Sequence, residues 1–191
     1  MGKEKAGIVF TLRAAASSDL EALLAIYAHH VRHGTASFEL EPPTLEDFSG
    51  RFRTLQMARY PYILAVTDDG RVLGYAYAGP YRPRPAYRYT VEDSVYVAPE
   101  AAGKGVGGAL LDRLIELADE QGYRKMVAVI GDSLQVASIA LHAGRGFVFA
   151  GTVRGVGYKH GRWLDQVLME RDLGPGNLTP PDEGPNAPTL G

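Results

Sequence analysis

The sequence predicts one α/β or α+β domain built on a mixed sheet, and three observations support this fold class. Runs of β type alternate with amphipathic helical runs along the chain. The length of 191 residues suits one domain of ordinary size with a real core. The apolar fraction of 46% and the charged fraction of 22% are typical of a soluble globular protein.

The first elements are a strand over residues 7–13 and a helix over 17–34, in which apolar side chains recur at helical spacing. Ser18 and Glu21 fit a capping box at the start of this helix, and Gly34 provides a stop. These signals place a helix directly after the first strand.

A second helix is expected to open at Thr44, and a hairpin follows around Asp69-Gly70. The later elements alternate strand, helix, strand, short helix, strand and hairpin, over 91–99, 106–121, 123–132, 133–144, 146–155 and 158–173. Residues 174–191 are rich in Pro and Gly and are expected to form an extended, mobile tail. The folded domain is therefore expected to cover residues 1–173.

Charge and composition narrow the function classes. The net charge of −2 gives no general attraction to nucleic acid or to anionic membranes. Cysteine is absent, which excludes disulfides, thiolate metal sites and a cysteine nucleophile. The apolar run near the N-terminus is too short for a signal peptide or a membrane span. We therefore expect a soluble cytoplasmic protein.

A glycine-rich loop between the strand over 91–99 and the next helix is the strongest chemical signal. Four glycines fall within six residues, namely Gly103, Gly105, Gly107 and Gly108. The glycines could simply form ordinary turns, but each glycine in a helix lowers helix stability by about 1 kcal/mol. The repetition favours a ligand that approaches bare backbone N–H groups, and Lys104 can add a positive charge.

Two phosphate ligands compete for this loop. Residues 103–108 formally satisfy the dinucleotide pattern G-x-G-x-x-G, with Asp132 as a candidate ribose-binding acid. However, the spacer "APEAA" separates the strand from the glycines, and little chain remains for a substrate domain. A P-loop is excluded because glycine follows Lys104. An acyl-CoA pyrophosphate suits the loop better.

The stretch "VYVAPEAAGKGVGGALL" resembles the central motif of the GNAT acyltransferases, [Q/R]-x-x-G-x-[G/A], at Gly105 and Gly107. Ala102 departs from it, because the family carries Gln or Arg there. The stretches "TASFELEPPT", "GYAYAGPYRPRPAY", "TVEDSVYV", "VAVIG" and "GYKHGRWLD" are similar to the phosphinothricin and methionine sulfoximine/sulfone N-acetyltransferase subgroup. Two further positions depart from the family. Gln135 stands where the family often has an Asn near the CoA arm, and Arg145 stands where the family usually has an apolar residue.

The resemblance implies a GNAT fold, a central mixed and mostly antiparallel twisted sheet flanked by helices, with acetyl-CoA as co-substrate and a homodimeric assembly. It implies that the backbone of residues 95–97 holds the pantetheine arm. The implied cofactor contacts are Val95, Tyr96, Val97, Gly103, Lys104, Gly105, Val106, Gly107, Gly108, Gln135 and Ser138.

Acetyl transfer to an amine needs a base, because an α-amine with a pKa above about 7.7 is largely protonated at pH 7. Glu92 matches the subgroup's base, and Asp93 is expected to point to the opposite face of a regular strand. His142 matches a subgroup histidine that either assists proton transfer or packs locally. Without cysteine, direct transfer in a ternary complex is the simpler expectation, although a serine nucleophile is formally open.

A carboxylate on the acceptor suits the guanidinium groups of Arg82 and Arg84, which alternate with prolines in "YRPRPAY". A solvated basic loop is the equally weighted alternative. The resemblance adds Tyr87 and an aromatic wall at Phe38; Arg88 lacks this support. The resemblance also includes residues 158–160, which are expected to contact either the substrate or a second subunit.

A metal site is not expected, because no carboxylate pairs with the histidines near the end of the first helix. The sequence thus predicts an N-acetyltransferase that moves acetyl from acetyl-CoA to the α-amine of a small amino acid or analogue, such as phosphinothricin or methionine sulfoximine or sulfone. Three alternatives stay open: transfer to another small amine, a non-catalytic CoA-binding module and, more distantly, a dinucleotide-dependent oxidoreductase.

Overall fold

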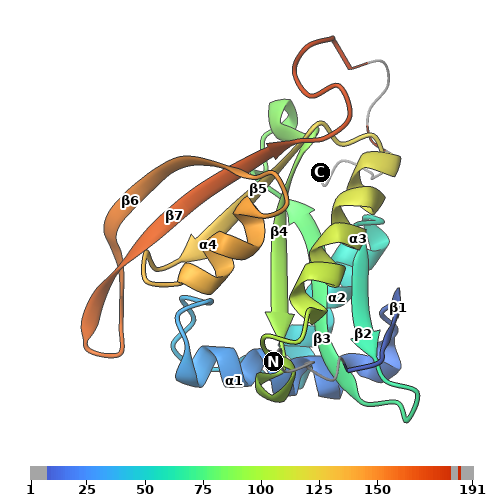
Figure 1. The fold of residues 1–191 in the computed structure, drawn as a ribbon, viewed down its shortest axis with the longest axis vertical. Helices are drawn as coiled ribbons and strands as arrows, with labels where there is room; N and C mark the ends of the chain where they lie inside the picture. Colours follow the sequence, from blue (N-terminus) through green and yellow to red (C-terminus); the bar gives the residue numbers. More distant parts are fainter. Residues whose placement is uncertain (1–7, 182–184, 186–191) are drawn as a thin grey trace, which may run out of the picture.

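The structure, a computed structural model, describes residues 8–181 and residue 185. These residues form a seven-stranded sheet in the order β1-β2-β3-β4-β5-β7-β6, shown in Figure 1. Its strands are β1 (Thr11–Ala14), β2 (Tyr62–Val66), β3 (Val72–Pro80), β4 (Thr90–Val97), β5 (Lys125–Gly131), β6 (Val148–Lys159) and β7 (Arg162–Asp172). β4 and β5 pair in parallel, and the other neighbours are antiparallel. The predicted mixed sheet is confirmed.

The α-helices are α1 (Leu20–His33), α2 (Leu45–Met57), α3 (Val106–Glu120) and α4 (Val136–Ala143). Short 3-10 turns are η1 (Ser17–Asp19), η2 (Pro85–Tyr87) and η3 (Pro99–Ala101). The predicted start of α2 at Thr44 is confirmed, since its hydroxyl accepts from the Asp47 backbone N–H. The predicted β2–β3 hairpin and the end of α1 at Gly34 are confirmed as well.

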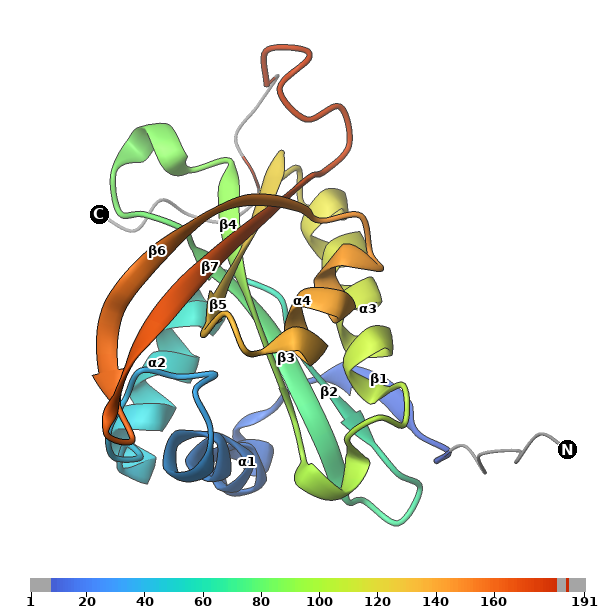
Figure 2. The same ribbon diagram turned by 60° about the vertical axis from the view of Figure 1, so that its left-hand side comes forward.

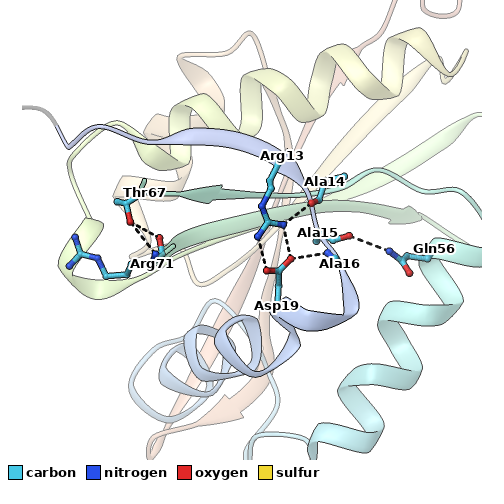
Figure 3. A network of polar contacts seen from close by, with 8 residues as sticks. All are labelled: Arg13, Ala14, Ala15, Ala16, Asp19, Gln56, Thr67 and Arg71. Carbon is cyan, nitrogen blue, oxygen red and sulfur yellow. Dashed lines mark hydrogen bonds and ion pairs between the residues drawn. The ribbon is translucent and has the colours of Figure 1, made fainter. Parts of the chain in front are cut away.

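The predicted capping box of Ser18 and Glu21 is wrong. The chain enters α1 through η1, and the Asp19 carboxylate accepts from the Ala16 backbone N–H at 2.8 Å. Arg13 of β1 also grips Asp19, with its two guanidinium nitrogens 2.7 and 2.8 Å from the carboxylate oxygens. Figure 3 shows this network, which ties the start of α1 to the edge strand. The hydrogen bond from Arg13 lowers the pKa of Asp19.

Helices cover both faces of the sheet, as Figure 2 shows with α1 and α2 on one side and α3 on the other. On the first face, Tyr27 of α1 meets Tyr96 of β4 at a centroid distance of 5.1 Å, and Phe52 of α2 meets Tyr62 of β2 at 4.9 Å. On the second face, α3 buries a leucine stripe that includes Leu110. Because successive side chains of a strand point to opposite faces, the side chains of β4 point alternately toward α1 and toward α3.

The start of the tail differs from the extended conformation expected for it. Residues 174–177 form hydrogen-bonded turns, and residues 178 and 179 form a bend. Arg124 holds them, because its guanidinium donates to the carbonyls of Gly176 at 2.8 Å and Thr179 at 2.9 Å. Most of the remaining tail lies outside the described residues. Within the described ranges, no helix combines the length and apolar character needed to cross a membrane.

Candidate active site

The site begins where β4 and β5 part. Their parallel ladder joins residues 90–93 to residues 125–128 and extends no further. Beyond it β4 continues along β3, while β5 continues along β7. In Figure 1, β5 turns away from β4 together with β6 and β7. Among residues 8–181, a stretch of β4 is therefore left without a neighbouring strand on its β5 side.

Backbone groups of two β4 residues face this gap. The backbone N–H of Ala98 donates to Leu73 of the β3 side at 2.9 Å. Because backbone polar groups alternate along a strand, Tyr96 also faces β3, while Val95 and Val97 face the gap. His30 of α1 donates from Nε2 to the Val97 carbonyl at 2.8 Å. The gap thus offers strand-like hydrogen-bonding groups for an extended ligand.

A cavity of about 750 Å³ fills the gap and connects the two faces of the sheet. On the α1 side it is lined by Phe38, Glu92 and Ser94, and on the α3 side by the glycine loop and α4. The lining includes most of the predicted cofactor contacts, namely Val95, Tyr96, Val97, Gly103, Gly105, Gly107, Gly108, Gln135 and Ser138. Lys104 is exposed and Val106 is buried, and both lie beside the lining.

The geometry of the glycine loop explains its composition. Gly103 and Gly105 have φ angles of +70° and +86°, in the left-handed region that favours glycine. A Cβ on Gly107 would lie 3.3 Å from the Val97 side chain, so this glycine lets α3 approach β4. No side chain of the described residues caps the N-terminus of α3. Its first N–H groups and its dipole can therefore act on an anion.

Glu92 lies on the cavity wall, on the α1 face of β4, and is half-buried. Burial and, to a smaller extent, the charge of Asp93 raise the pKa of Glu92 to about 7, against the opposing charge of Arg82. A carboxyl group with this pKa is partly ionised at neutral pH, and its ionised fraction can take a proton.

Asp93 projects to the opposite face, as predicted, and its side chain is 2% exposed. Its carboxylate lies 3.0 Å from Nε2 of His142, and Nδ1 of His142 donates to the Ser138 carbonyl at 2.7 Å. Both ring nitrogens of His142 are therefore occupied. The structure thus gives this histidine a buried carboxylate partner.

Comparison with known proteins decides the family. The family model described as acetyltransferase (GNAT) domain matches residues 12–168. The chain belongs to the GNAT acetyltransferase family. The enzyme class and the GNAT fold predicted from the sequence are thereby confirmed. The dinucleotide interpretation of the loop is wrong, and the mixed sheet contradicts it independently, since a dinucleotide fold has a largely parallel sheet.

Three relatives place this GNAT protein within the family. It is 50% identical to phosphinothricin N-acetyltransferase of Alcaligenes faecalis, over 95% of this chain and 92% of that protein. It is 42% identical to L-methionine sulfoximine/L-methionine sulfone acetyltransferase of Pseudomonas aeruginosa, over 89% and 98%. A phosphinothricin acetyltransferase from Sinorhizobium meliloti, solved with acetyl-CoA, superposes with a TM-score of 0.90 at 45% identity, covering 94% and 96%. The suspected subgroup is thus confirmed as the group this chain resembles.

The predicted substrate residues of this GNAT protein fall in two places. Phe38 lines the cavity, enclosed by Gly131 and Gly157, where Cβ atoms would overlap its ring. Arg82, Arg84 and Tyr87 lie on the exposed loop between β3 and β4, outside the cavity lining. Arg82 is nevertheless close enough for its charge to act on Glu92.

His30 at the site had no predicted role, and Lys159, within the matched residues 158–160, makes a contact that was not predicted. His30 belonged to a histidine cluster without an assigned role, although its spacing of three from the buried Tyr27 is a helical signal for the same face. Lys159, 4% exposed, donates to the Ser37 carbonyl at 2.7 Å and ties the β6–β7 hairpin to the loop after α1. No sequence signal identified this contact, because the partner is a backbone atom 122 positions away.

The part of the chain that the structure describes contains no group of three or more His, Cys, Asp or Glu side chains that could hold a metal ion. The histidines of α1 instead pack against each other, with the ring centroids of His29 and His33 4.8 Å apart and their planes tilted by 44°.

Proposed function

We propose that this enzyme transfers the acetyl group of acetyl-CoA to the α-amine of a small amino acid or analogue of the phosphinothricin or methionine sulfoximine/sulfone type. The observation that carries the proposal is the position of Glu92, a carboxyl group with a pKa of about 7 beside the gap in the sheet. The names of the relatives support the acceptor class and acetyl-CoA as co-substrate.

In this proposal the pantetheine arm occupies the gap and pairs with the backbone groups of Val95 and with the N–H of Val97, whose carbonyl accepts from His30. The CoA pyrophosphate lies on the N–H groups of the glycine loop and the first turn of α3. The thioester then lies near Glu92, and a backbone N–H in the gap stabilises its oxyanion.

Glu92 takes a proton from the acceptor's ammonium group, directly or through one water, and the free amine attacks the thioester carbon. An N–C bond forms, the C–S bond breaks with its electron pair going to the CoA sulfur, and the second proton that the nitrogen loses ends on this sulfur. His142 acts through Asp93 and not on the acceptor, because its ring nitrogens are already bonded. It is a positioning residue in this scheme.

The acceptor enters on the α1 face, where Phe38 forms an aromatic wall. The loop that carries Arg82 and Arg84 supplies positive charge on the same side as Glu92, which suits an acceptor carboxylate or phosphinate. Tyr87 packs against Tyr81 at a centroid distance of 5.8 Å and stiffens this loop.

We also propose a homodimer, as the resemblance implies. The β6–β7 hairpin exposes large apolar side chains, including Phe149 at 65% and Trp163 at 67%. Exposed patches of this kind mark interaction sites. Sedimentation of the purified protein tests this: a dimer is expected for the wild type, and a monomer would contradict it. A cytoplasmic location stays a prediction.

The test of function is release of free CoA from acetyl-CoA with a panel of amino acids, their analogues and simple amines. Release with amino acids, and a loss of roughly 10²–10⁴-fold in kcat/KM for Glu92→Gln, are expected. Release only with simple amines would favour the broader acyltransferase. If none of the acceptors causes CoA release and the protein still binds CoA tightly, the non-catalytic module would be favoured.

A further inference from the structure

Arg145, just after α4, reaches the first turn of α3. Its Nε lies 3.1 Å from the Gly108 carbonyl, and Nη1 lies 3.3 Å from the Leu141 carbonyl. The guanidinium also pairs with Asp112, one turn further along α3, at 2.9 Å. These contacts hold the cation beside the last glycine of the loop, on the wall of the cavity.

Arg145 is the one side chain with a permanent positive charge among the described residues that line the cavity. The other candidates at the loop do not fill this role. Lys104 is exposed and lies outside the lining, and Ala102 lacks the polar side chain that its position carries in the resembled motif. Within the cavity lining, the loop residues therefore offer only neutral N–H groups to a ligand that carries several negative charges.

We propose that Arg145 binds a phosphate group of acetyl-CoA and supplies the side-chain contact that Ala102 cannot make. The inference rests on the proposed function, because it requires acetyl-CoA in this cavity. A guanidinium fork suits phosphate oxygens, and charge-assisted bonds of this kind are stronger than neutral ones.

The surroundings leave Arg145 free to make this contact. Asp112 is 55% exposed, and an exposed ion pair contributes little, so the guanidinium can exchange it for a phosphate at small cost. Gly108 is the matching feature on α3. A Cβ at this position would overlap the Arg145 guanidinium, so the absence of a side chain there allows the cation to lie against the helix.

The experiment measures the dissociation constants of CoA, 3′-dephospho-CoA and pantetheine by calorimetry for the wild type and Arg145→Met. We expect the variant to bind CoA roughly tenfold or more weakly and pantetheine equally well. If wild type and variant bind 3′-dephospho-CoA alike, the contact is to the 3′-phosphate. If the variant's loss persists with that ligand, the contact is to the pyrophosphate. Either result supports the proposal.

Two further variants separate a phosphate contact from a structural role. Asp112→Asn removes the competing carboxylate and should tighten CoA binding, whereas a purely structural ion pair predicts no gain. Arg113→Met is the matched control, since it removes one charge from a residue of α3 outside the lining and should leave CoA binding unchanged.

Three results would overturn the proposal. One is wild-type affinity for CoA in Arg145→Met with an unchanged melting temperature. Another is an equal loss for CoA and pantetheine, which would indicate a damaged cavity. Failure of the wild type itself to bind CoA would instead remove the proposed function, and the role of Arg145 with it.

Discussion

His142 and Asp93 form a buried pair on the face of β4 opposite to Glu92, with Nε2 of His142 3.0 Å from the Asp93 carboxylate. Because Nδ1 must donate to the Ser138 carbonyl, Nε2 carries a proton only when the ring is a cation. Burial by itself lowers the pKa of His142, but the hydrogen bond and the charge of Asp93 outweigh it, and the net direction is upward. Below its raised pKa, the ring is therefore an imidazolium paired with the Asp93 carboxylate.

This pair should make stability depend on pH. A raised pKa means that the folded state binds the proton more tightly, so the stabilisation is fully present below about pH 6.5 and lost as pH rises through the folded pKa. We expect the difference in free energy of unfolding between wild type and His142→Gln to be about 1–3 kcal/mol below about pH 6.5 and to shrink as the pH rises through the raised pKa of His142. Urea titrations from pH 5.5 to 9 measure it, with exposed His33→Gln as control. A difference that stays constant with pH would show a neutral ring.

Asp93 should also influence the pKa of Glu92. After burial, the negative charge of Asp93 is the next cause that raises the pKa of Glu92. Asp93→Asn should therefore lower that pKa, and the acidic limb of the pH profile of kcat/KM should move to lower pH. With one acceptor used throughout, titration of the amine cancels from the comparison. Exposed Glu116→Gln, which removes a distant charge, should leave the limb in place. A limb that stays at the same pH in Asp93→Asn would remove Asp93 as an influence on the base.

Most of the fold could be predicted because the signals are local. Hydrophobic period, the Thr44 cap and the Asp69-Gly70 turn each depend on residues close in sequence. The capping box failed because Asp19, between the two residues of the box, has a partner in β1: the guanidinium of Arg13 and the Ala16 N–H both use its carboxylate. A tertiary contact thus overrode a local pattern.

At the site, too, the residues that depend on local signals could be predicted, and those that depend on tertiary packing could not. Glu92 and the glycine loop lie on one strand–loop–helix unit, so the sequence alone placed them together. Arg145, His30 and Lys159 reach backbone carbonyls on other elements, and a carbonyl has no sequence identity. Such contacts depend on the packing of α1, α4 and the β6–β7 hairpin around the gap, which no local pattern encodes.

The loop arginine Arg82 should select for a carboxylate on the acceptor. Arg82→Ala is expected to raise KM roughly tenfold or more for amino-acid acceptors and to leave KM for the matching decarboxylated amines unchanged. Because the charge of Arg82 lowers the pKa of Glu92, the acidic limb should also move to higher pH. Arg88→Ala is the control, since Arg88 lies over the Tyr89 ring at 4.7 Å. Equal effects on both acceptor classes would contradict selection by charge.

Gly131 should set the position of the acceptor wall. A Cβ there would overlap the Thr35 carbonyl and lie 2.9 Å from the Phe38 ring, and neither can retreat without moving the loop after α1. Gly131→Ala is therefore expected to cost about 1–3 kcal/mol in the free energy of unfolding and to raise KM for the acceptor while the dissociation constant of CoA stays unchanged. Gly151→Ala in β6, where the added atom meets nothing within 4 Å, is the matched control and should be neutral or slightly stabilising.

A double variant separates the two clashes. Phe38→Leu added to Gly131→Ala relieves the ring contact and leaves the Thr35 carbonyl in place, so only part of the lost stability should return. Denaturant midpoints of the four proteins in this cycle measure the coupling. Full recovery would show that the ring alone fixes the loop, and no coupling would show that Phe38 does not depend on Gly131 for its position.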